Sequence, residues 1–142
     1  MKMQKEVMPL ETINAVDLQR IAEAIGVTLL HHDGGPKGWY DSYTHCVSTR
    51  RGLSIQQYRS TLAHELCHAI HRDQPTGNGH YDQRQERRAD TYAARLLIDP
   101  KAFRDAYAWH GPHIPAIADE LEVTQHILNH WLEITPSNLL EI

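Results

Sequence analysis

Residues 61–68 read Thr-Leu-Ala-His-Glu-Leu-Cys-His, an H-E-x-x-H motif with histidines at positions 64 and 68. If this segment is helical, side chains four residues apart share one face, so His64 and His68 can reach the same metal ion. Glu65 is turned by about 100° from His64 and can therefore lie beside that ion without binding it. Two histidine ligands next to such a carboxylate are the pattern of zinc-dependent peptide hydrolysis, with Glu65 as the general base for a metal-bound water.

A helix around this motif is predicted independently. Ser54 and Gln57 form a capping box, and the loop residue Pro75 follows, so the helix should run from Ser54 to about Ile70. The chain contains 11 histidines, and a chance motif is the alternative. The apolar neighbours argue against chance, because they predict partial burial, where unpaired imidazoles would be costly. These neighbours are Leu62, Ala63, Leu66, Ala69 and Ile70.

A second helix, predicted over Asp82–Leu97, carries Glu86 and Asp90 on one face. A catalytic zinc usually takes three protein ligands. One of these acids can be the third ligand while the other accepts a hydrogen bond from a ligand histidine. The alternative is a solvated charged face, since arginines crowd this segment. An apolar stripe opposes that alternative and indicates that the helix packs on another element; its members are Ala89, Ala93, Leu96 and Leu97.

The two segments TLAHELCHAIH (61–71) and ERRADTYAARLLIDP (86–100) together resemble the ImmA/IrrE-type metallopeptidases, a gluzincin-like group. The second segment matches the family pattern at Glu86, Ala89, Asp90, Tyr92, Ala93, Leu96, Leu97 and Pro100. The resemblance covers roughly residues 20–135. It implies Glu86 as the third ligand of a Zn²⁺ ion and Asp90 as the hydrogen-bond partner of a ligand histidine. One departure is Cys67, where the family commonly has Gly; a small buried residue is the simplest interpretation.

The same resemblance implies a substrate, namely a helix-turn-helix transcriptional repressor that is cut at one site. Such proteins are typical of mobile elements, prophages and stress-response switches. Nothing in the residues themselves indicates this substrate.

The reaction also needs a donor for the oxyanion that forms on the peptide carbonyl. The candidates are His80, Tyr81, Tyr92 and Tyr40, and no feature of the sequence distinguishes among them. His71 is predicted either to support the site or simply to end its helix. The remaining histidines are predicted to be surface or packing residues: His31, His32, His45, His110, His113, His126 and His130.

The rest of the chain predicts an α+β fold, with a small twisted sheet packed on the H-E-x-x-H helix and a mostly helical C-terminal half. The predicted strands are Val27–Leu30, Trp39–Tyr43 and Thr44–Thr49, with a hairpin at Asp41 and Ser42. An edge strand within Thr44–Thr49 is expected to bind an extended peptide by strand addition. The other predicted helices are Thr12–Ile25, Lys101–Trp109, Ala116–Leu121 and Thr124–Ile134.

The 142 residues fit one domain, residues 1–142, in which residues 114–135 have helix-turn-helix spacing. This tail contains four acidic residues and no Lys or Arg, so we expect a lid or packing element rather than a DNA-binding unit. The net charge of −4 gives no reason to expect affinity for nucleic acid or membranes. Two cysteines and the lack of an apolar leader predict a cytoplasmic protein.

The sequence therefore predicts a zinc-dependent metalloendopeptidase. The competing hypothesis is a non-enzymatic zinc-containing regulator that binds a repressor or another protein. Occupation of the fourth metal position, by Cys67 or His71, would favour this regulator.

Overall fold

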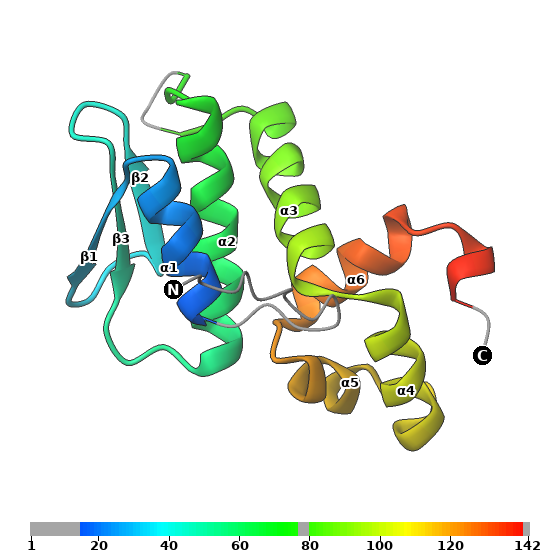
Figure 1. Cartoon of the computed structure of the whole chain (residues 1–142). Coiled ribbons are helices and arrows are strands. Elements are labelled where there is room, and N and C mark those ends of the chain that lie inside the picture. The colour runs from blue at the N-terminus through cyan, green and yellow to red at the C-terminus, as the bar shows by residue number, and fades with distance from the viewer. Residues whose placement is uncertain (1–14, 77–79, 141–142) are drawn as a thin grey trace, which may run out of the picture.

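A computed structural model describes residues 15–76 and 80–140 of the chain. It confirms the predicted α+β class, with all strands in the N-terminal half (Figure 1). The strands are β1 (Thr28–His32), β2 (Gly38–Asp41) and β3 (Cys46–Arg50). The helices are α1 (Ala15–Ala24), α2 (Ile55–His71), α3 (Gln83–Leu97), α4 (Pro100–His110), α5 (Ile114–Leu121) and α6 (Gln125–Ile134), followed by a 3-10 turn, η1 (Ser137–Leu139). The start of the helix predicted over Thr12–Ile25 lies outside the described residues.

The sheet has the order β1-β3-β2, in which β3 is parallel to β1 and antiparallel to β2. The prediction that Thr44–Thr49 holds an edge strand is therefore wrong. The predicted hairpin of β2 and β3 does form, but β1 pairs with the far side of β3 and makes it the central strand. Its residues Val47, Ser48 and Thr49 are buried, as expected for a strand with a neighbour on both sides.

The two site-bearing helices both begin with capping boxes. On α2, Oγ of Ser54 accepts the N–H of Gln57, whose side chain in turn accepts the N–H of Ser54. Asp82 and Gln85 repeat this arrangement at the start of α3. Each box satisfies backbone N–H groups in the first turn and so fixes where its helix begins.

Helix α2 lies at the centre of the fold, between the sheet on one side and α3 on the other (Figure 1). Ala89 and Ala93 of α3 are fully buried, and such small side chains let two helices approach closely. Helix α6 packs against α3, and α5 against α4 and α6. No helix in the described part of the chain is long and apolar enough to cross a membrane.

Arg59 joins α2 to the turn between α5 and α6. It is 2% exposed, and its Nη1 donates to the carbonyl oxygens of Leu121 and Glu122 at 2.9 and 2.7 Å. We expect Arg59→Met to lower the free energy of unfolding by about 2–3 kcal/mol, because it removes a buried charged donor that two backbone carbonyls share. Urea unfolding measures this loss.

The matched control is Arg104→Met, since Arg104 also donates to a carbonyl, that of Leu139, but at the surface. This change should cost no more than about 0.5 kcal/mol. Equal losses in the two variants would contradict the role given to Arg59.

Candidate metal centre

The imidazoles of His64 and His68 point from α2 toward α3 and meet Glu86. Their Nε2 atoms lie 2.9 and 3.0 Å from the same carboxylate oxygen, Oε1 of Glu86. The three donor atoms lie within 4.8 Å of one another. Two histidines and one glutamate are a known ligand set for catalytic zinc.

A carboxylate also contacts each of these two histidines at the ring nitrogen that does not face Glu86. Nδ1 of His64 lies 2.8 Å from Oδ1 of Asp90, and Nδ1 of His68 lies 2.8 Å from Oδ2 of Asp73. A carboxylate on Nδ1 holds the ring orientation and the tautomer that leaves Nε2 for a metal.

The ionisation of these groups favours a cation between them. Burial alone would lower the pKa of His64, but its hydrogen bonds to Asp90 and Glu86 outweigh that effect and raise the pKa to about 10. Burial alone would raise the pKa of Asp90, but hydrogen bonds from His64 and His126 lower it to about 2. Hydrogen bonding to His64 is likewise the main reason that the pKa of Glu86 is lowered. The carboxylates thus stabilise a positive charge at His64, and a metal ion that binds there would take the place of the proton.

Glu65 follows His64 on α2, lines the same pocket on the side nearer β2, and is 8% exposed. Its Oε1 atom is buried and has no hydrogen-bond partner among the residues that the structure describes. Burial is the main reason that the pKa of Glu65 is raised. A buried carboxylate oxygen without a partner fits a site that receives a water or substrate group.

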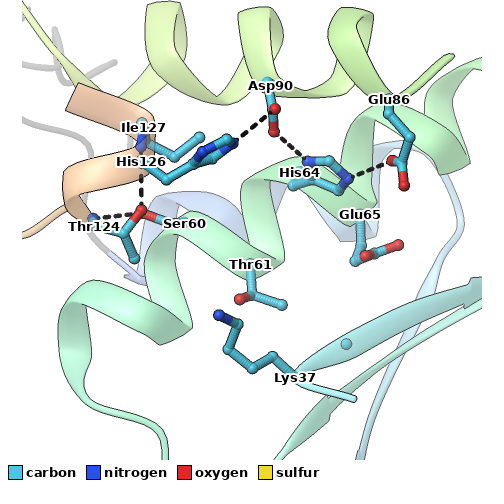
Figure 2. A pocket seen from close by; sticks show the side chains of 11 residues that line it. Lys37, Ser60, Thr61, His64, Glu65, Glu86, Asp90, Thr124, His126 and Ile127 are labelled. Atoms are coloured by element: carbon cyan, nitrogen blue, oxygen red, sulfur yellow. Dashed lines mark hydrogen bonds and ion pairs between the residues drawn. The ribbon is translucent and has the colours of Figure 1, made fainter. Parts of the chain in front are cut away.

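A pocket of about 430 Å³ opens beside these residues (Figure 2). A Cβ atom on Gly38 would lie 2.5 Å from Cγ2 of Thr61 and 3.4 Å from Cγ of Glu65, so only glycine lets β2 begin this close to α2. The pocket is lined by Lys37, Gly38, Ser60, Thr61, His64, Glu65, Glu86, Asp90, Thr124, His126 and Ile127.

Residues 22–133 match the family described as the IrrE N-terminal-like domain, a peptidase family. The chain belongs to this family. The match includes α2 and α3 entirely, and it confirms the resemblance drawn from the sequence.

A solved structure described as a Mycobacterium tuberculosis transcriptional regulator has the same fold as this family member. It matches with a TM-score of 0.64 and 16% identity, over 89% of this chain and 43% of that protein. The chain therefore spans less than half of its structural neighbour's length. No curated protein matches the chain.

The four candidate oxyanion donors of this IrrE-like domain differ in their contacts and in their exposure. The Tyr81 ring stacks on His68 with centroids 3.8 Å apart, and its hydroxyl donates to the carbonyl of Tyr40. The Tyr40 hydroxyl is bonded to His45, and Tyr92 packs against the core. His80 is exposed. A donor role for any of these residues remains a prediction.

Asp73 and His126 are site residues that sequence reasoning missed. Asp73 follows the left-handed residue Arg72, which ends α2, and its N–H donates to the carbonyl of His68. This turn brings the Asp73 carboxylate back over the last turn of the helix. An acid two residues past the end of a helix was the available signal, but it is also common in ordinary loops.

We expect Asp73→Ala to weaken zinc binding by about 10- to 100-fold, because the buried His68 ring then loses the partner that orients it. Competition with a chromogenic chelator measures this change. Asp105→Ala removes an exposed carboxylate bonded to Lys101, and should leave zinc affinity unchanged. An Asp73→Ala protein that folds and binds zinc as tightly as wild type would show that His68 needs no such support.

Proposed function

We propose that this chain is a zinc-dependent endopeptidase whose metal is held by His64, His68 and Glu86. The observation that carries the proposal is the convergence of these three donors beside Glu65, a buried carboxylate with an unpartnered oxygen. Membership of a peptidase family supports the reaction type.

A zinc ion bound there would supply a Lewis acid that lowers the pKa of a coordinated water and polarises the peptide carbonyl. Glu65 takes one proton from the water as its oxygen attacks the carbonyl carbon. Glu65 then gives this proton to the amide nitrogen, so that the C–N bond breaks and a neutral amine leaves. Asp90 and Asp73 hold the two histidines throughout, so the metal site does not need to reorganise.

Strand addition to β2 is the proposed binding mode for the peptide. Within the described residues, β2 pairs with β3 on one side and with no strand on the other. Gly38 at its start lines the pocket together with Glu65. A second hollow, lined in part by Tyr81, Arg87 and His130, shares Glu86 and Asp90 with the pocket. A substrate strand on β2 thus has room on both sides of the proposed metal.

The helical tail is proposed to belong to the same single domain and to form one wall of the substrate site. His126 and Ile127 line the pocket, and α6 packs on α3. This supports the lid or packing role expected from its acidic composition.

The proposed substrate is a helix-turn-helix repressor, encountered in the cytoplasm. The family resemblance supports it, and the structural neighbour's description as a transcriptional regulator is compatible with it. The competing non-enzymatic regulator would need a fourth protein ligand. Cys67 is buried against the carbonyl of Arg88 and His71 is exposed, and the only described residues grouped for a metal are His64, His68 and Glu86.

Intact-mass analysis of a helix-turn-helix repressor encoded beside the gene tests the function. The repressor is incubated with the zinc-loaded chain and, separately, with zinc-loaded Glu65→Gln. A single cut by wild type alone is expected. Equal cleavage by both proteins would contradict the role of Glu65 as the base, and cleavage by neither would contradict the proposed substrate.

A further inference from the structure

His126 connects the C-terminal helices to the metal centre. It lies in the first turn of α6, and its Nε2 atom lies 2.9 Å from Oδ2 of Asp90. The other oxygen of Asp90 lies 2.8 Å from Nδ1 of His64. Figure 2 shows the resulting chain of side chains from His126 through Asp90 and His64 to Glu86.

Both oxygens of the Asp90 carboxylate are therefore engaged by imidazole nitrogens. A carboxylate held at one oxygen only can rotate about its χ2 angle, which is broad for aspartate. Held at both oxygens, Asp90 presents Oδ1 to His64 in one orientation. Because an ionised carboxylate only accepts hydrogen bonds, Nε2 of His126 must carry a proton to complete this arrangement.

The backbone of His126 is itself held in place. Thr124, two residues before it, caps α6, and the N–H of Thr124 donates to Oγ of Ser60 on α2. Ile127 and Leu128 of the same turn are buried. His126 is 72% exposed at its side chain, so core packing does not account for its position at Asp90.

We propose that His126 is a positioning residue for the metal site, acting on His64 through Asp90. The inference rests on the proposed metal ligands but not on peptidase activity. Zinc affinity then depends on how the C-terminal helices sit on α2 and α3, although these helices supply no ligand.

Zinc affinity of the full chain, measured by chelator competition, tests this inference. We expect His126→Ala to weaken zinc binding by about three- to ten-fold, less than Asp90→Ala, whose loss should reach about 10- to 100-fold. His126→Gln should restore affinity, because a Gln amide can donate to Asp90 in the same direction. The Co²⁺-loaded His126→Ala protein should also show an altered visible absorption spectrum.

His130→Ala is the matched control. His130 lies one turn further along α6 and also forms a hydrogen bond with α3, with Nε2 2.8 Å from Oγ1 of Thr91, whereas the hydrogen bonds of the Asp90 carboxylate go to His64 and His126. Its loss should leave zinc affinity and the Co²⁺ spectrum unchanged. In an Asp90→Ala background, adding His126→Ala should have no further effect.

Three results would overturn the inference: unchanged affinity in His126→Ala, an equal loss in His130→Ala, or additive losses in the Asp90/His126 double variant. Substrate cleavage tests the proposed function separately from zinc affinity. A chain with the expected pattern of affinities that cuts no substrate would keep the positioning role and lose the peptidase. A wild-type chain that binds no zinc would overturn both.

Discussion

Glu65→Gln is expected to lose cleavage activity by about 10²- to 10⁴-fold while still binding one zinc ion. The amide has nearly the same shape as the carboxylate but cannot take a proton from water. Glu65 makes no hydrogen bond to His64 or His68, so the proposed ligands keep their geometry. Cleavage rates from time-resolved intact-mass spectra, with zinc content measured on the same samples, check both parts of this expectation.

The same substitution, which should lower activity, is expected to raise the stability of the folded chain. Glu65 is buried with one oxygen unpartnered, and a neutral side chain there avoids burying a charge. We therefore expect metal-free Glu65→Gln to be more stable than wild type by about 0.5–2 kcal/mol, as for other sites where function opposes stability. Urea unfolding of the two metal-free proteins measures this difference.

Glu120→Gln serves as the matched control. Glu120 carries a carboxylate that forms a hydrogen bond with His110, and it does not line the pocket. This variant should cleave at the wild-type rate. Cleavage retained in Glu65→Gln would remove Glu65 from its role as the base, and loss of zinc in that variant would mean that Glu65 binds the metal.

The second large effect is expected for Glu86→Ala, which should weaken zinc binding by more than about 100-fold. Glu86 supplies the only carboxylate oxygen that both Nε2 atoms approach among the described residues. Loss of a ligand should cost more than loss of a group that only orients one, for which about 10- to 100-fold is usual. Alanine is also the best helix former, so α3 should remain intact.

Thermal unfolding with and without zinc gives an independent reading of the same change. A metal that binds only the folded state raises the midpoint by an amount set by its concentration relative to Kd. Wild type should show a zinc-dependent rise, and Glu86→Ala should show almost none at the same concentration. If Glu86→Ala binds zinc normally and Asp90→Ala does not, Asp90 is the third ligand instead.

The sequence by itself determined the helices that carry the site. Histidine spacing in H-E-x-x-H, the Ser54–Gln57 capping box and the apolar stripe of 82–97 are local patterns, and helix hydrogen bonds are local too. For the same reason, the i,i+4 spacing alone places His64 with His68, and Glu86 with Asp90, on shared helix faces.

Only the tertiary structure decided which strand is central and which distant residues support the metal centre. A hydrophobic pattern gives the buried faces of a strand but not its neighbours, so β3 was misplaced at an edge. His126 lies 36 residues from Asp90 in the chain, and no local rule links them. Their contact depends on how α6 docks on α3, which is set by packing among residues that are far apart in sequence.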